Sequence, residues 1–128
     1  RWAANCWHIG DVAVPMVPVR CIERVPRVPR CARPFLAANA PSIGAYLRWM
    51  AQKDVLGQDM CLTGADDSAR RWVALQFCQH AEREVQHLVL TRDTTESDIK
   101  QRKEIRGGAL HHENQPAVEA ALNGQVLI

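Results

Sequence analysis

The distribution of proline is the feature that most limits how this chain can fold. Six of the seven prolines lie within residues 1–41, where Val-Pro recurs at positions 14, 17, 25 and 28. Proline fixes φ and removes a backbone donor, so we expect an extended or polyproline-like segment rather than a helix or a sheet. The same residues include six arginines and only two acids. We therefore predict a Pro/Arg-rich leader or linker over residues 1–41, extended or disordered, with an interaction arm as the alternative.

The overall composition excludes several classes of function. Sixteen basic residues are spread along the chain and are balanced by fourteen acidic ones, which gives no case for a nucleic-acid partner. The longest apolar stretch, residues 12–19, contains two prolines and is too short to span a membrane. Five cysteines without C-x-x-C spacing indicate reduced thiols in an intracellular compartment. The adjacent residues His111, His112 and Glu113 point in different directions, so we predict no metal site.

Residues 42–128 alternate helical and strand-like segments. Ser42 after Pro41 is a helix-start signal, and apolar residues then recur at helical spacing. Strands that alternate with helices predict an α/β fold with a parallel, doubly wound sheet. The predicted strands are Asp59–Thr63, Val85–Leu90 and Gln125–Ile128, and the predicted helices are 43–53, 69–84, one that ends near Ile105 before Gly107 and Gly108, and 116–122.

The loop after the first predicted strand has the position of a phosphate-binding P-loop. That motif reads G-x-x-x-x-G-K-[ST], in which backbone N–H groups and the lysine hold phosphates while the hydroxyl binds Mg²⁺. The frame here keeps only Gly64, because Ala69 replaces the second glycine, Arg70 the lysine and Arg71 the hydroxyl residue. The pattern leaves two alternatives, a degenerate (Walker A) phosphate loop or an ordinary strand-to-helix turn.

Two acids in this loop oppose phosphate binding. A carboxylate about 6 Å from a phosphate charge costs roughly 3 kcal/mol at an effective dielectric near 20. Asp66 and Asp67 could instead cap the following helix and fill its anion site themselves. Arg70 could contact a phosphate, whereas Arg71 cannot ligate a metal.

The second informative segment is LTRDTTESDIKQRKEIR at residues 90–106, where a polar turn follows an apolar run. Both Asp93-x-x-Glu96 and Thr95-x-x-Asp98 fit a capping box, which predicts a charged helix after the turn. Ligand loops of open α/β sheets follow the carboxyl ends of strands, so the turn from Thr91 to Thr95 is expected at that rim.

Three stretches together carry a family resemblance: YLRWMAQKDVLGQDMCLTG at residues 46–64, the arginines at 70 and 71, and the segment at residues 90–106. Through them residues 43–128 resemble the dynein-related, MoxR-like AAA+ ATPases, whereas residues 1–41 take no part. The resemblance implies a partial P-loop NTPase sheet with flanking helices, preceded by the Pro-rich arm. It also implies ATP and Mg²⁺ as cofactors, other AAA+ modules or ring subunits as partners, remodelling of protein clients, and a mitochondrial location.

The resemblance also assigns roles to individual residues. Asp66 and Asp67 depart from the family, which has a Pro/Gly-rich loop there, and residues 110–114 depart from an apolar and aromatic hairpin or pore-side strand. The implied cofactor-binding residues are Gly64, Ser68, Ala69, Arg70 and Arg71, and the implied coupling loop between subunits is Thr91, Arg92, Asp93, Thr94 and Thr95.

The end of the chain matches the strand that leads into the Walker B acids of this family. We expect those acids, the sensor residues, the arginine finger and the helical lid beyond Ile128. In the family's strand order, 5-1-4-3-2, the second and third strands can pair, while the first lacks its neighbours. We therefore expect residues 42–128 to be the amino-terminal part of an AAA+ module that is inactive alone, with a non-catalytic interaction or scaffold module as the alternative.

Overall fold

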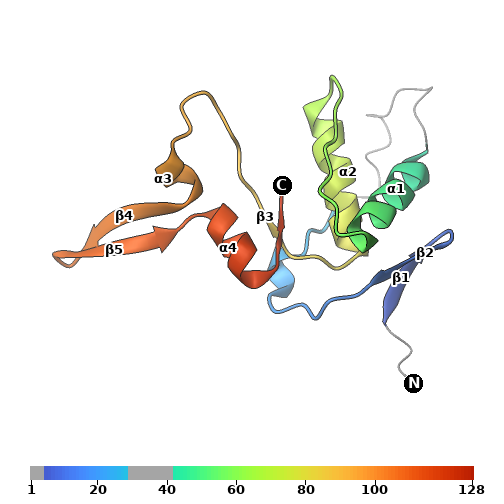
Figure 1. Cartoon of the computed structure of the whole chain (residues 1–128), viewed down its shortest axis with the longest axis horizontal. Helices are drawn as coiled ribbons and strands as arrows, with labels where there is room; N and C mark the ends of the chain where they lie inside the picture. Colours follow the sequence, from blue (N-terminus) through green and yellow to red (C-terminus); the bar gives the residue numbers. More distant parts are fainter. Residues whose placement is uncertain (1–4, 29–41) are drawn as a thin grey trace. The chain divides into compact units, whose positions relative to one another are not determined.

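The computed structural model describes residues 5–28 and 42–128. Their backbone divides into two compact units, one up to Arg83 and one from Glu84 to Ile128, and each is described separately (Figure 1). None of the helices formed by these residues combines the length and the apolar character that crossing a bilayer requires.

The first unit contains two helices and a β-hairpin. Helix α1 (Ile43–Val55) packs on α2 (Asp67–His80), and the antiparallel strands β1 (Cys6–Ile9) and β2 (Val12–Pro15) contact α1. The core consists of apolar side chains that recur at helical spacing, together with one valine from the hairpin: Leu47, Met50, Ala51, Val73, Phe77, Ala81 and Val14.

The prediction that residues 1–41 form no sheet is wrong for the hairpin. Pro15 is the last residue of β2, and Pro18 lies after it, so neither removes a donor from the middle of the ladder. Val14 is fully buried, and Trp7 packs edge-on against Phe77 with ring centroids 5.9 Å apart. A 3-10 turn, η1 (Ile22–Arg24), follows. The rest of the predicted leader, residues 29–41, lies outside the described residues, so the boundary after residue 41 stays a prediction.

Residues 59–63, predicted as the first strand, do not form one. A strand needs a neighbour to pair its backbone groups, and none of the described residues provides one here. The helix that follows begins at Asp67, two residues earlier than predicted, and ends at His80 rather than near Glu84. Glu82 then adopts a left-handed conformation with φ 49°, which stops the helix from continuing.

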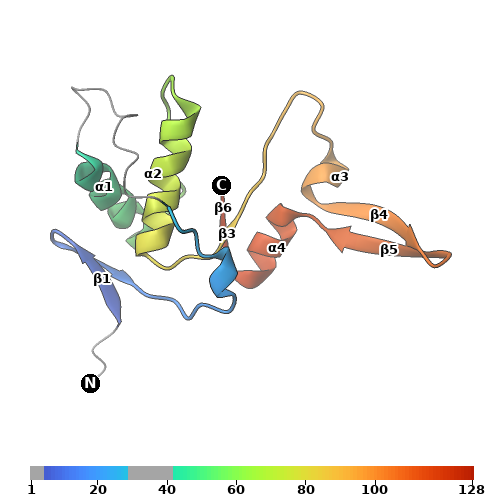
Figure 2. The ribbon, with the colours of Figure 1, turned by 180° about the vertical axis from the view of Figure 1, so that it is seen from behind.

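The second unit contains the parallel pairing expected between the second and third strands. Strand β3 (Val85–Gln86) pairs with β6 (Val126–Leu127), and Leu88 N donates to Ile128 O at 2.8 Å beyond the pair (Figure 2). Helix α4 (Pro116–Asn123) connects to β6 through Gly124, whose φ of 66° caps the helix. Within the described chain, this pair is the extent of the predicted parallel sheet.

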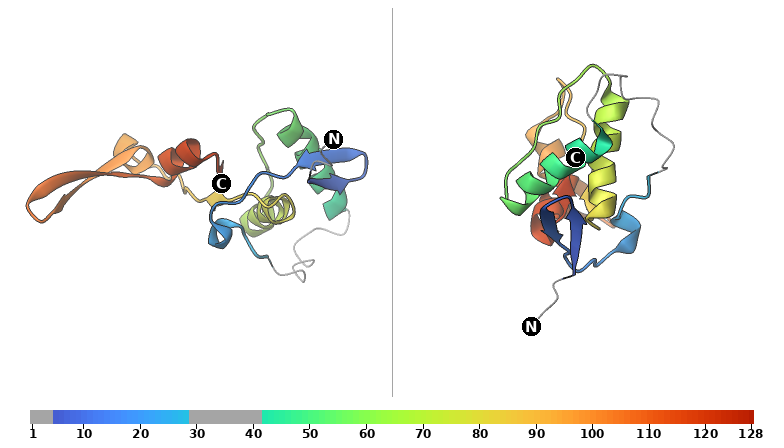
Figure 3. Two further views of the ribbon diagram at one scale, coloured as in Figure 1. Left: turned by 90° about the horizontal axis from the view of Figure 1, so that it is seen from below. Right: turned by 90° about the vertical axis from the view of Figure 1, so that its right-hand side faces the viewer.

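The charged segment predicted as a helix ending near Ile105 folds differently. Only a single turn is helical, α3 (Glu96–Ile99), and it is followed by antiparallel strands β4 (Gln101–Arg106) and β5 (Ala109–Asn114) (Figure 3). Gly107 and Gly108 have φ of 59° and 80°, so they form a two-residue hairpin turn rather than a helix end. Residues 110–114 depart in composition from the family's apolar and aromatic strand, yet they lie within a strand that is paired along its whole length.

Candidate functional site

The two acids of the loop from Gly64 to Arg71 interact with other residues of the same loop. Asp66 is the N-cap of α2, and its Oδ1 accepts a hydrogen bond from Ala69 N at 3.1 Å. A helix N-terminus attracts anions because its first N–H groups are unpaired and its dipole is positive there. In this chain a carboxylate occupies that position, as the sequence suggested.

The arginine at the lysine position is held by the same loop. Arg70 Nη2 forms an ion pair with Asp67 Oδ1 at 2.8 Å, and Arg70 Nη1 donates to Gly64 O. Ala69, at the position of the second glycine, is buried, whereas Ser68 and Arg71 are exposed on the first turn. The structure thus brings Gly64, Arg70 and the two acids together and leaves Ser68 and Arg71 outside their contacts.

These residues do not fit a bound Mg²⁺-nucleotide. The N–H group of Ala69, in the first turn of α2, is bonded to the Asp66 carboxylate, and Arg70, at the position of the lysine, is paired with Asp67. Arg71 has no lone pair for Mg²⁺. Elsewhere in the described chain no three His, Cys, Asp or Glu side chains form a group that could hold a metal ion.

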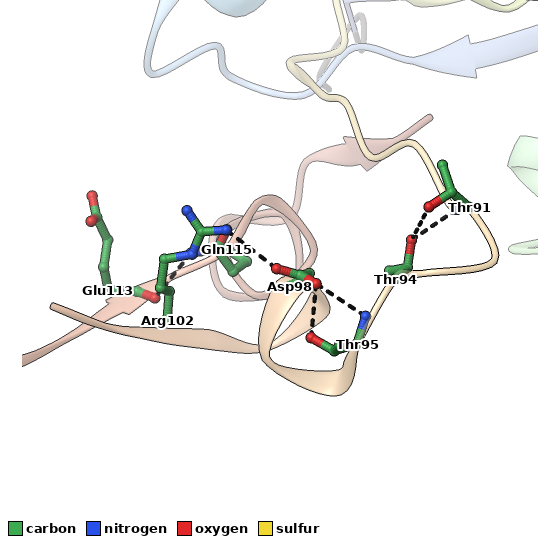
Figure 4. A network of polar contacts seen from close by, with 7 residues as sticks. All are labelled: Thr91, Thr94, Thr95, Asp98, Arg102, Glu113 and Gln115. Atoms are coloured by element: carbon green, nitrogen blue, oxygen red, sulfur yellow. Dashed lines mark hydrogen bonds and ion pairs between the residues drawn. The ribbon is translucent and has the colours of Figure 1, made fainter.

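The predicted coupling loop is an ordered turn (Figure 4). Thr91 N donates to Thr94 Oγ1 at 2.8 Å, and Thr94 N donates back to Thr91 O at 3.2 Å. Arg92 and Asp93 are the two central residues of this turn, and both side chains are exposed. The loop therefore presents one cation and one anion on a hydrogen-bonded turn.

The end of this loop is fixed by the predicted capping interaction. Asp98 Oδ2 accepts hydrogen bonds from Thr95 N at 3.0 Å and from Thr95 Oγ1 at 2.7 Å (Figure 4). These bonds, with a further one from Arg102, hold the pKa of Asp98 below its usual value. Of the two predicted capping boxes, the one formed by Thr95 and Asp98 is confirmed.

Sequence reasoning missed the polar contacts that continue from this cap into the β4–β5 hairpin. Arg102 Nη2 reaches back to Asp98 Oδ1 at 3.3 Å, and Gln115 Nε2 donates to Glu113 O at 3.4 Å (Figure 4). The signal that could have found them is Gly107-Gly108 between two six-residue segments, a common hairpin turn.

The thiol of Cys78 is buried in the first unit. Burial, with a smaller contribution from Asp54, raises the pKa of Cys78 to about 12. Arg83, which forms an ion pair with Asp54 at 2.8 Å, opposes this rise only in part. Because the thiolate is the nucleophilic form, Cys78 is unreactive at neutral pH, as expected of a buried helix cysteine. Cys6 and Cys61 are also free thiols.

Comparison with known proteins places this geometry in context. Residues 59–128 match the family model described as AAA domain (dynein-related subfamily). The chain is also 43% identical over 120 residues to von Willebrand factor A domain-containing protein 8 of mouse (Mus musculus). No solved structure gives a significant match.

The extent of the mouse match corrects one expectation. It covers 94% of this chain, so the similarity extends into residues 1–41, which the sequence analysis had placed outside the resemblance. The chain itself spans only 6% of the length of that relative.

Proposed function

Because this chain belongs to the dynein-related subfamily of AAA domains, we propose that it forms the amino-terminal part of an ATPase module in a larger protein. The parent protein would couple ATP binding and hydrolysis to the remodelling of protein partners, within a ring of modules or subunits. The similarity to a much longer relative and the parallel β3–β6 pair support this proposal. We further propose a mitochondrial location, for which the resemblance is the support.

The chain itself is proposed not to bind Mg²⁺-ATP productively. The observation that carries this proposal is the hydrogen bond from Ala69 N to Asp66 at the N-terminus of α2. A phosphate at that position would lose this donor and meet two carboxylates, each costing roughly 3 kcal/mol at about 6 Å.

Calorimetric titration of the purified chain with Mg²⁺-ATP tests this proposal. We expect no saturable heat at micromolar to millimolar nucleotide. The double variant Asp66→Asn with Asp67→Asn removes the charge of both side chains and keeps their shape. Asparagine also caps helices, but it removes the repulsion of phosphate and the ion pair between Asp67 and Arg70. Measurable binding by this variant alone supports the proposal, and micromolar, Mg²⁺-dependent binding by the unmodified chain contradicts it.

The alternative function is a non-catalytic interaction module that uses the nucleotide fold as a scaffold. The observation that favours it is the occupied loop at Gly64, where Arg70 and Asp67 are paired to each other. Retained binding of a partner AAA module after the double variant above, with or without ATP, supports the scaffold role. Deletion of the first 41 residues is a poor test, because it removes Val14 and Trp7 from the first unit.

A further inference from the structure

The β4–β5 hairpin has two faces of different chemistry. Directly paired residues of antiparallel strands share a face, and successive residues alternate between faces. The register therefore separates twelve side chains into two sets. The charged face consists of Arg102, Glu104, Arg106, Ala109, His111 and Glu113, and the apolar-tip face of Gln101, Lys103, Ile105, Leu110, His112 and Asn114.

Charged side chains of the charged face form ion pairs with one another and with the base of the hairpin. Arg106 pairs with Glu104 at 2.7 Å and with Glu113 at 3.3 Å, and Arg102 pairs with Asp98 at 3.3 Å. The contact with Arg106 is the main reason that the pKa of Glu104 is lowered. This face therefore has little electrostatic gain left to offer a partner.

The apolar-tip face has exposed apolar side chains and a lysine without an ion pair to the described residues. Ile105 and Leu110 are cross-strand partners in the second pair from the turn, yet they are 78% and 57% exposed. Lys103, two residues from Ile105 on the same face, makes no ion pair with any residue in the described ranges, and the face contains no carboxylate. Gln101 and Asn114, at the far end, are already bonded to each other at 2.7 Å.

We propose that the apolar-tip face of the β4–β5 hairpin binds an acidic, apolar segment of a protein partner. Apolar side chains of the partner would cover Ile105 and Leu110, since burying apolar area is the main favourable term in association. A carboxylate of the partner would pair with Lys103, and charge complementarity of this kind selects the partner and its orientation. This inference goes beyond the proposed function, because it does not depend on nucleotide at Gly64.

A lipid surface fits the same face less well. Residues 96–114 contain four acids and four bases, so the hairpin and its base carry no net positive charge to attract anionic headgroups. Two apolar side chains alone offer little area for insertion. Lys103 has no ion pair with the described residues and no carboxylate on its face, so it matches a single carboxylate beside apolar side chains of a polypeptide.

The test uses the full ¹⁵N-labelled chain and two synthetic ten-residue peptides, one alternating leucine with glutamate and one alternating leucine with lysine. Amide shifts are followed by NMR during titration, and vesicles of phosphatidylcholine with phosphatidylserine are titrated separately. We expect saturable shifts centred on Lys103, Ile105 and Leu110 with the glutamate peptide, and at least fivefold weaker binding of the lysine peptide.

Matched variants on the two faces sharpen this test. The double variant Ile105→Thr with Leu110→Thr keeps β-propensity and should weaken binding at least tenfold. Lys103→Gln leaves the turn intact and should weaken it about twofold to fivefold, as for one exposed ion pair. Arg102→Gln, on the charged face, should change affinity by less than twofold.

Several outcomes would overturn the proposal. These are the absence of saturable shifts, shifts centred on the charged face, equal affinity for the two peptides, or binding to vesicles without binding to the glutamate peptide. If the threonine variant loses the cross-strand contacts of the hairpin, Lys103→Gln against Arg102→Gln decides the question, and equal effects of these two count against the proposal.

Discussion

The two β-hairpins within the described residues have similar topology and opposite environments. Strands β1 and β2 fold against helix α1, and Val14 of β2 is fully buried. Strands β4 and β5 are longer, but Ile105 near their turn is 78% exposed and their side chains are mostly polar or charged. An isolated two-stranded hairpin is marginally stable in water, so each needs a different source of stability. The first relies on burial, and the second on its turn, its cap and the cross-strand ion pair between Arg106 and Glu113.

This contrast separates a hairpin that contributes to the core from a hairpin that can contact a partner. Burial stabilises the first hairpin and leaves it few groups for a partner. The second retains exposed apolar and basic groups because it contributes little to a core. The following tests probe that difference.

The largest effect is expected where the first hairpin meets α2. Phe77 is 1% exposed and packs against Trp7, so Phe77→Ala should reduce the free energy of unfolding by about 3–5 kcal/mol. Urea denaturation followed by circular dichroism measures this. Leu56→Ala, at a position 67% exposed, is the control and should stay within about 0.5 kcal/mol. Similar losses in both variants would show that the first unit has no core at Phe77.

The second hairpin should depend most on its turn. Valine at both Gly107 and Gly108 must adopt φ near 59° and 80°, which costs about 1–2 kcal/mol per residue. We expect cross-strand NMR contacts between β4 and β5 to disappear. Gly44→Ala, in the regular helix α1, serves as the control and should stabilise the chain by about 0.5–1 kcal/mol. Persistence of the hairpin in the valine variant would show that its side-chain pairs suffice.

The cap at the base of the second hairpin should respond to pH. In the fold, Thr95 holds the pKa of Asp98 below the usual 3.8. The unfolded state thus binds the proton more readily, so the capping contribution is fully present above pH 3.8 and is lost as pH falls through the lower folded pKa.

Thr95→Ala should cost about 1 kcal/mol of local stability and move the pKa of Asp98 back toward 3.8. Carboxyl ¹³C titration by NMR measures that shift. Ser97→Ala, within the same helical turn, should leave the pKa of Asp98 unchanged. An unshifted titration in the Thr95 variant would instead assign the lowering to Arg102.

The smallest effect is expected where threonine replaces an exposed apolar residue of the second hairpin, and a threonine in the buried part of the first hairpin is the comparison. Ile105→Thr removes apolar surface that is already in water and should change the free energy of unfolding by less than about 0.5 kcal/mol. Val14→Thr places a hydroxyl in a fully buried position and should cost about 1–3 kcal/mol. Denaturant midpoints compare the two, and equal costs would remove the proposed difference between the hairpins.

Elements that are marked by local cap and turn residues were predicted correctly from the sequence, whereas elements that depend on strand pairing were mostly missed. It identified α1 from Ser42, the capping role of Asp66, the helix that ends at Gly124, and the pairing of β3 with β6. It missed both hairpins because prolines suggested an extended leader and charges suggested a helix. For the candidate site, it identified the acids that oppose phosphate, but it did not predict that Arg70 would pair with Asp67 and Gly64.

By itself the sequence determined the local features, which depend on a few consecutive residues. Ser42 and Asp66 accept hydrogen bonds from N–H groups three residues ahead, and Gly124 adopts the left-handed conformation that ends a helix. Only the tertiary structure decided which extended segments became strands. A strand satisfies its N–H and C=O groups through a neighbour, and that neighbour is distant in sequence for β3 and absent from the described residues for residues 59–63.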